Sequence, residues 1–166
     1  MDIVIINGSS RIGSFNQSFV TYIQDLSNSH SIKFFDVSAL PLFQDRKNAI
    51  TQSVSEWRTI IRSSQSLIIT SPEYLFNIPA ALKNAFEWLN EDNLLAQKRV
   101  LPIILTPLEP RGEKAMQSLL WTLQSLHADI QPSLSLYHSD FTSVNDSLVA
   151  NNETLEILEA CLENLS

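Results

Sequence analysis

The sequence predicts an α/β domain built on a parallel sheet. Short apolar runs rich in β-branched residues recur along the 166 residues, and segments with helical spacing alternate with them. Such runs are typical of strands that helices cover on both faces, because neither side of the sheet then meets water. Strands that alternate with helices through short connections form parallel sheets with right-handed crossovers. We therefore expect one doubly wound domain over residues 1–166.

Five apolar runs are the strand candidates, and four segments have the spacing of amphipathic helices. The runs are Ile3–Ile6, Ile32–Phe35, Leu67–Thr70, Val100–Leu105 and Ile130–Tyr137. The helical segments carry apolar residues at 15, 19, 23 and 26, at 82, 85, 86 and 89, at 116, 119, 120, 123 and 126, and at 155, 158, 162 and 165. The stretches 39–52 and 138–152 fit neither pattern, so we expect irregular loops there.

Composition restricts the functions open to the chain. The net charge of −7 disfavours nucleic acid and anionic membranes as partners. A single cysteine supplies neither an intrachain disulfide nor a Cys-rich zinc site. The first residues lack the regions of a signal peptide, and no apolar stretch approaches the roughly 18 residues that span a bilayer. We expect a cytoplasmic protein that binds no nucleic acid and no membrane.

The loop after the first apolar run has the composition of a phosphate site. Ligands of doubly wound folds bind at the carboxyl ends of the strands. There the next helix begins with free N–H groups and a partial positive potential. Hydroxyl and amide groups add donors, and Arg11 adds a charge-assisted contact. The candidate donors are Ser9, Ser10, Ser14 and Asn16. The spacing of Gly8 and Gly13 fits neither a P-loop nor a Rossmann pattern.

A simpler interpretation is open for two of these residues. Ser14 or Asn16 could cap the helix that follows, because any turn from strand to helix needs a cap. Capping does not account for Arg11 or for the density of donors around it. The phosphate interpretation therefore explains more of the loop.

A second loop follows the third apolar run. It contains Pro72-Glu73-Tyr74, and Pro79 stands near the first turn of the next helix. Such a stiff loop could lie along a flat ring and present backbone amides to its polar edge. The alternative is a turn that only starts a helix, whose apolar residues belong to the core. Trp88 on the flank of that helix is then a core residue, an interface residue or a ligand contact.

The two loops together resemble those of the NAD(P)H-dependent FMN reductase family, which includes quinone, chromate and azo-dye reductases. The first loop matches the family pattern G-S-x-R-x-x-S-x-N at every fixed position. The second matches P-E-Y and then P-x-x-L-K-N-A, with Trp88 in place. The resemblance covers about the first 130 residues. It implies a flavodoxin-like three-layer sandwich, a five-stranded parallel sheet in the order 2-1-3-4-5 with helices on both faces.

The resemblance also implies the residues of a flavin site. The first loop would hold the FMN phosphate, and amides of the second would stabilise the negative charge of the reduced ring. The expected cofactor-binding residues are Ser9, Ser10, Arg11, Ser14, Phe15, Asn16, Pro72, Glu73, Tyr74, Leu75, Asn77 and Thr106. A single phosphate site favours FMN over FAD. The flavin carries the chemistry, so we expect no catalytic side chain and no metal.

The sequence departs from the family pattern in two places. Leu75, Asn77 and Ala80 stand where asparagine, serine and glycine are usual, so ring recognition would rest more on backbone donors. The segment Thr106–Gly112 keeps one glycine of a usually glycine-rich loop. Arg111 in that segment could contact a dinucleotide phosphate or the ring edge, although a solvated surface position is the preferred interpretation of a single charge.

The remaining reactive side chains form no recognisable constellation. Cys161 lies near the apolar stripe of the last helix, so we expect it to be buried and inert. His30, His127 and His138 lack ligand spacing and are expected at the surface or in local caps. Trp121 points away from the apolar face of its helix, which indicates a subunit interface.

These features favour an FMN-dependent oxidoreductase. By resemblance, it would take a hydride from NADPH or NADH and pass electrons by a ping-pong mechanism to a quinone, flavin or similar small acceptor. The family also implies a homodimer or homotetramer. Two alternatives are open. A flavodoxin-type electron carrier is one, although Arg11 and Asn16 argue against it. The other is a relative without flavin that serves to bind a partner. The altered segment Thr106–Gly112 motivates this second alternative.

Overall fold

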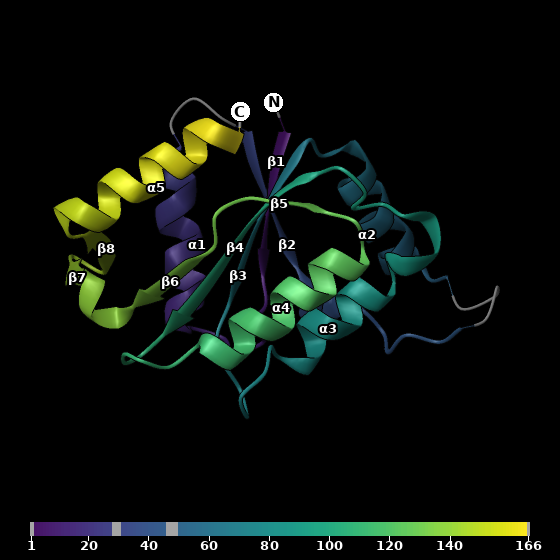
Figure 1. Ribbon diagram of the computed structural model, residues 1–166, viewed down its shortest axis with the longest axis horizontal. Coiled ribbons are helices and arrows are strands. Elements are labelled where there is room, and N and C mark those ends of the chain that lie inside the picture. Colours follow the sequence, from purple (N-terminus) through teal and green to yellow (C-terminus); the bar gives the residue numbers. More distant parts are fainter. Residues whose placement is uncertain (1, 28–30, 46–49, 166) are drawn as a thin grey trace.

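The computed structural model describes residues 2–27, 31–45 and 50–165, and these form three layers around a parallel sheet (Figure 1). The strand order is β2-β1-β3-β4-β5. Strand β6 pairs with the later residues of β4, after the part of β4 that pairs with β5. This order confirms the flavodoxin-like prediction. The strands are β1 (Asp2–Asn7), β2 (Ser31–Asp36), β3 (Ser66–Ser71), β4 (Arg99–Thr106), β5 (Asp129–Ile130) and β6 (Leu134–Tyr137).

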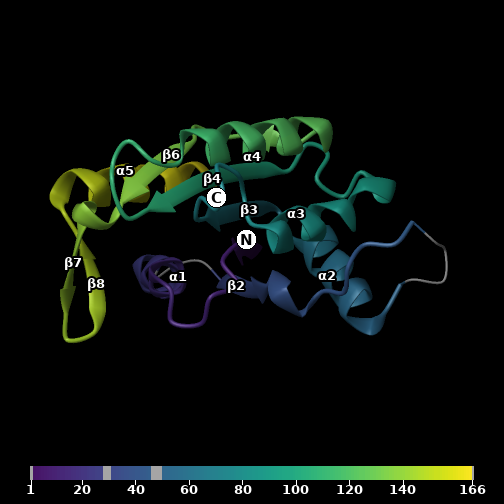
Figure 2. The ribbon, with the colours of Figure 1, turned by 90° about the horizontal axis from the view of Figure 1, so that it is seen from below.

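Helices cover both faces of the sheet, as predicted. Alternate strand residues point to opposite faces, so Ile3 and Ile5 belong to one core cluster while Val4 and Ile6 belong to the other. Figure 2 shows α1 and α4 on opposite sides of the sheet. The first cluster lies under α1 (Phe15–Leu26) and α5 (Asn152–Leu165), and the second lies under α2 (Gln52–Ser63), α3 (Ala80–Glu87) and α4 (Glu113–Ser125).

The last predicted strand, Ile130–Tyr137, is divided into β5 and β6. Pro132 lies in the gap between them, where its missing N–H leaves no donor for the ladder with β4. Strand β6 still reaches the carboxyl edge of the sheet, because Tyr137 pairs with Thr106 at the end of β4. His138 therefore follows a strand end, as the ligand-binding loops do.

Two segments differ from the predicted loops. In the first, the predicted loop 39–52, helix α2 already begins at Gln52, after its cap Thr51. Positions 46–49 of that loop lie outside the described residues. His30, which was expected at the surface or in a local cap, also lies outside them. The prediction that residues 138–152 form an irregular loop is wrong. This stretch contains the short helix η3 (His138–Asp140) and an antiparallel hairpin of β7 (Phe141–Val144) and β8 (Ser147–Ala150). Its turn, Asn145-Asp146, has positive φ at both residues, which these two residue types tolerate.

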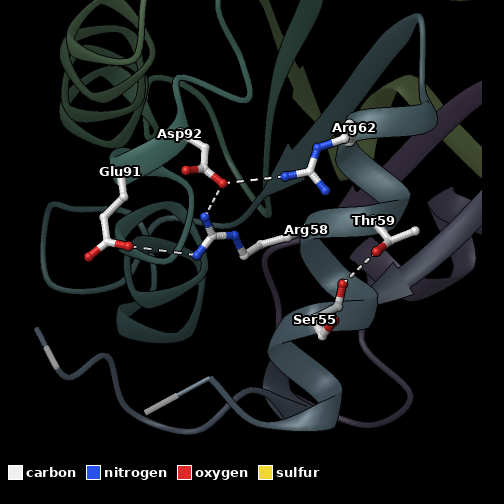
Figure 3. Close-up of polar contacts among 6 residues, drawn as sticks. All are labelled: Ser55, Arg58, Thr59, Arg62, Glu91 and Asp92. Atoms are coloured by element: carbon white, nitrogen blue, oxygen red, sulfur yellow. Dashed lines mark hydrogen bonds and ion pairs between the residues drawn. The ribbon is translucent and has the colours of Figure 1, made fainter. Parts of the chain in front are cut away.

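Ion pairs connect α2 to the short helix η2 (Asn90–Asp92), which follows α3 (Figure 3). Arg58 contacts the carboxylates of both Glu91 and Asp92, and Arg62 lies 3.3 Å from the same Asp92 carboxylate. None of these residues lines the cleft described below. In the described part of the chain, no helix has both the length and the apolar character needed to cross a membrane.

Candidate functional site

Three loops at the carboxyl edge of the sheet enclose a cavity of about 390 Å³, which we call the cleft. Loop 1 (residues 8–14) follows β1, loop 2 (72–79) follows β3, and loop 3 (107–112) follows β4. The volume of the cleft is in the range of about 300–1,000 Å³ that is usual for small-molecule sites. It is lined by Ser9, Arg11, Gly13, Ser14, Phe15, Asn16, Pro72, Glu73, Tyr74, Leu105, Pro107, Arg111 and His138.

Loop 1 is shaped by its two glycines and by the start of α1. Gly8 donates its N–H to the Thr70 carbonyl at 2.8 Å, and a Cβ there would lie 2.8 Å from the Leu82 side chain. Gly13 has a φ of 66°, which favours glycine, and open space surrounds it. Ser14 caps α1 by accepting the N–H of Gln17 at 3.3 Å, so the capping interpretation of Ser14 is confirmed. The first turn of α1 carries no acidic residue, so its positive end is not neutralised from within the helix.

Asn16 connects α1 to the two central strands. Its side chain is 4 % exposed. The amide donates to the Leu105 carbonyl at 3.4 Å, and the amide oxygen accepts the Thr70 hydroxyl at 3.0 Å. Asn16 lines the cleft, but these bonds make it a support for the start of α1 as much as a donor to a ligand.

Loop 2 is a tight turn whose tip points out of the cleft. Tyr74 and Asn77 exchange both backbone hydrogen bonds at 2.9 Å, and the two residues between them have positive φ of 50° and 59°. The turn leaves Leu75 97 % exposed. The Asn77 side chain accepts the Ser118 hydroxyl at 2.6 Å and so is directed toward α4. The Tyr74 hydroxyl reaches back to loop 1, 3.5 Å from the Ser9 hydroxyl.

Loop 3 is packed closely against its own strand. The Thr106 side chain is 2 % exposed and donates to the Arg111 carbonyl at 3.2 Å, which closes the loop. Gly112 has a φ of 106°, and a Cβ there would lie 2.8 Å from Ile104. The Glu73 carboxylate of loop 2 accepts the N–H of Ala115 at 3.2 Å in the first turn of α4. Loop 2 is therefore tied to the first turn of α4, and loop 3 is tied to the end of β4.

The structure brings most of the expected site residues together. The expected residues that line the cleft are Ser9, Arg11, Ser14, Phe15, Asn16, Pro72, Glu73 and Tyr74. Four others do not line it. Ser10 faces a smaller neighbouring cavity of about 210 Å³ together with Asp36. Leu75 is in solvent, Asn77 is bonded to α4, and Thr106 supports loop 3 from beneath.

Sequence reasoning did not assign His138 and Arg111 to the site. The His138 ring stacks on Phe15 with centroids 3.9 Å apart, and burial lowers the pKa of His138. The ring is therefore neutral at neutral pH. Its position directly after the last apolar run was a usable signal, because ligand loops follow strand ends. Arg111 is exposed to solvent, as expected, but it also lines the cleft.

Two further motif residues have structural roles instead. The Asn84 amide donates to the Pro41 carbonyl at 2.9 Å and its oxygen accepts the Phe43 N–H at 2.7 Å. The Trp88 indole donates to the same Pro41 carbonyl at 2.9 Å, and Trp88 is 3 % exposed. Trp88 is thus a core residue and contacts neither the cleft nor a free surface.

The chemistry of the cleft fits a planar cofactor with one phosphate. Hydroxyls, the Arg11 guanidinium and the amino terminus of α1 are donors that an anion requires. In the same cleft, Pro72, Tyr74 and Pro107 give flat or rigid apolar surface. In the part of the chain that the structure describes, no three His, Cys, Asp or Glu side chains are grouped to hold a metal ion.

Comparison with known sequences gives a consistent result. Residues 1–142 match the family described as NADPH-dependent FMN reductase. A 2-hydroxy-1,4-benzoquinone reductase of Burkholderia sp is 32 % identical over 90 residues, 53 % of this chain and 49 % of that protein. A quinone reductase of Escherichia coli is 30 % identical over 112 residues, 61 % of this chain and 57 % of that protein. The chain thus matches about half the length of these curated relatives.

Solved structures share the fold. The flavoenzyme NAD(P)H:(acceptor) oxidoreductase FerB of Paracoccus denitrificans superposes with a TM-score of 0.86, over 99 % of this chain and 94 % of that one, at 20 % identity. The apo form of an NADH:FMN oxidoreductase gives 0.80, over 99 % and 87 %, at 18 % identity. A flavodoxin from the Archaea gives 0.64, over 99 % and 96 %, at 8 % identity. At these identities the likeness concerns the fold.

Proposed function

The chain belongs to the NADPH-dependent FMN reductase family, and on this premise we propose that it is a flavin-dependent oxidoreductase. It would use FMN to carry electrons from NADPH or NADH to a small acceptor such as a quinone or a flavin. The observation that carries the proposal is the convergence of three loops on one cleft, with anion donors at loop 1 and flat apolar groups at loops 2 and 3.

Loop 1 would hold the FMN phosphate. Ser9 and Ser14 offer hydroxyls, and Arg11 offers two parallel N–H groups to phosphate oxygens. The first turn of α1 adds N–H groups that have no carbonyl partner within the helix. Asn16 fixes the direction of that turn through its bonds to β3 and β4. These groups are in place in the chain itself, so little reorganisation is needed on binding.

Loops 2 and 3 would hold the isoalloxazine ring. When bound, FMN supplies the capacity to accept a hydride and to pass electrons on. The residues Pro72, Glu73 and Tyr74 orient the ring. Among them, Glu73 offers a backbone donor to its polar edge, because proline has no N–H and the Tyr74 N–H is bonded to the Asn77 carbonyl. The Glu73 side chain ties loop 2 to α4 through the N–H of Ala115, which fixes the position of this donor. Pro107 of loop 3 adds a rigid apolar group to the lining of the cleft.

We propose that the nicotinamide donor and the acceptor use the same side of the cleft in turn, which gives ping-pong kinetics. The 166 residues would act as a single FMN-binding domain, in the cytoplasm. The side chains at the tip of loop 2, Leu75 and Phe76, are 97 % and 74 % exposed, and this supports a homodimer. Trp88 gives no such support, because it is buried within the chain.

The identity of the bound chromophore tests the proposal. We expect the purified protein to be yellow, to release its chromophore on heating, and to yield FMN by mass spectrometry. A colourless protein that takes up no FMN when it is supplied would overturn the proposal and favour a flavin-free relative. FAD in stoichiometric amount would contradict the assignment of a single phosphate site at loop 1.

A further inference from the structure

A second and larger cavity adjoins the cleft on the outer side of loop 3. It has a volume of about 580 Å³ and lies between α4 and β6. We call it the α4 groove; Arg111, Gln117, Trp121, Gln124 and Tyr137 are among its lining residues. Arg111 lines both the groove and the cleft. A ligand in the cleft could therefore continue past Arg111 into the groove.

The groove combines a flat aromatic surface with polar donors. Trp121 is 63 % exposed, which is unusual for so large an apolar side chain. Gln117 and Gln124, one turn before and one turn after it on α4, lie within reach of the same ligand. Arg111 stands at the entrance from the cleft. An aromatic platform, side-chain amides and a guanidinium are the groups that bind a purine base and its phosphates.

We propose that the α4 groove binds the adenylate half of the nicotinamide dinucleotide. This inference rests on the proposed function, because it requires that the nicotinamide half enters the cleft. Arg111 would contact the pyrophosphate that joins the two halves, Trp121 would stack on the adenine, and Gln117 and Gln124 would bond to its polar edge. The exposure of Trp121, which suggested a subunit interface, then has a ligand as its reason.

A different location for the adenylate half and a different role for Trp121 both fit the structure less well. The smaller cavity beside loop 1 also adjoins the cleft, through Ser9 and Arg11. It lies at loop 1, where the FMN phosphate is placed, and not at loop 3. A subunit interface that covered the α4 groove would also cover the Glu113 carboxylate in its lining, whereas interface centres are depleted of charge apart from arginine.

Binding of ADP-ribose to the FMN-loaded protein, measured by calorimetry, tests the proposal without turnover. We expect saturable binding to the wild type, and binding about tenfold weaker in Trp121→Ala and in Arg111→Ala, as loss of one stacking or ionic contact implies. Phe34→Ala, which alters the smaller cavity, should bind as the wild type does. No binding to the wild type, equal binding to Trp121→Ala, or loss of binding in Phe34→Ala would overturn the proposal.

A second measurement separates this inference from the proposed function. Reduced nicotinamide mononucleotide lacks the adenylate half, so Trp121→Ala should raise the KM for NADPH or NADH and leave the KM for the mononucleotide unchanged. An equal effect on both donors, or a change of oligomeric state in Trp121→Ala by sedimentation, would refute the groove as an adenylate site. If neither donor reduces the flavin of the wild type, the proposed function fails, and ADP-ribose binding still decides the role of the groove.

Discussion

Arg11 is the residue on which the phosphate assignment depends most. It lies in the cleft beside Ser9 and Ser14. Replacement by alanine should weaken FMN binding by about ten- to a hundredfold, since a hydrogen bond to a charged group contributes about 1.5–3 kcal/mol. The fold should persist, because the exposed Arg11 side chain supports no core. Fluorescence titration of the apo protein with FMN measures the effect, with Arg62→Ala as control. Equal affinities in Arg11→Ala and wild type would contradict the assignment.

The lowered pKa of His138 predicts that the stability of the protein depends on pH. Burial lowers the pKa of His138, so the folded chain resists a proton that the unfolded chain accepts below about pH 6.5. The wild type should therefore lose more stability than His138→Gln as the pH falls from 7.5 to 5.5, while above pH 7 the contribution of this protonation vanishes. Thermal unfolding of both proteins at the two pH values measures this. Equal losses of stability in the two proteins would show that protonation of His138 does not destabilise the folded chain.

The directions of the side chains within the loops could not be predicted from the sequence. The motif placed loops 1 to 3 at one site, and the structure shows them there. It did not reveal that Leu75 is at the tip of a two-residue turn, or that Asn77 bonds to Ser118 of α4. Those directions follow from backbone dihedrals and from a helix distant in sequence. Thr106 is a related case, since its hydroxyl closes loop 3 instead of lining the cleft.

At the scale of elements, strands were easier to place than the connections between them. The continuous apolar runs of β1, β3 and β4 arise because these strands are buried on both faces. Pro132 divides the last run in a way that composition alone does not reveal. The hairpin of β7 and β8 is partly exposed, so its short alternation was hidden among polar residues. Its Asn145-Asp146 turn was the usable signal.

We expect Asn84 to be essential for holding the segment that contains Pro41 and Phe43 against helix α3. Asn84→Ala removes the bonds to Pro41 and Phe43. The Phe43 N–H loses its partner, while the Pro41 carbonyl keeps the bond from Trp88. We expect a loss of about 1–3 kcal/mol in the free energy of unfolding, because buried unsatisfied groups are costly. Urea unfolding measures it. Trp88→Phe, which removes one bond to Pro41, is a second probe of the same attachment. A loss of less than about 0.5 kcal/mol in Asn84→Ala, typical of surface changes, would show that Asn84 is dispensable.

At the scale of the whole molecule, the exposed tip of loop 2 bears on assembly. Leu75 and Phe76 lie at the rim of the site in a conformation with positive φ, which is uncommon for large side chains. We expect sedimentation at micromolar concentration to give a dimer or a larger species. A variant with Leu75→Ser and Phe76→Ser should be smaller while it keeps its fold. A wild-type monomer would contradict the proposed homodimer.

The central claim is that a flavin held in the cleft accepts electrons from a nicotinamide donor, and rapid mixing tests it most directly. The FMN-loaded protein is mixed without oxygen with NADPH, with NADH, or with a chemical reductant, and the absorbance of the oxidised flavin is followed. We expect at least one nucleotide to bleach the flavin, and a quinone added afterwards to restore the absorbance. If the chemical reductant bleaches the flavin and neither nucleotide does, the protein is an electron carrier, and the oxidoreductase proposal is wrong.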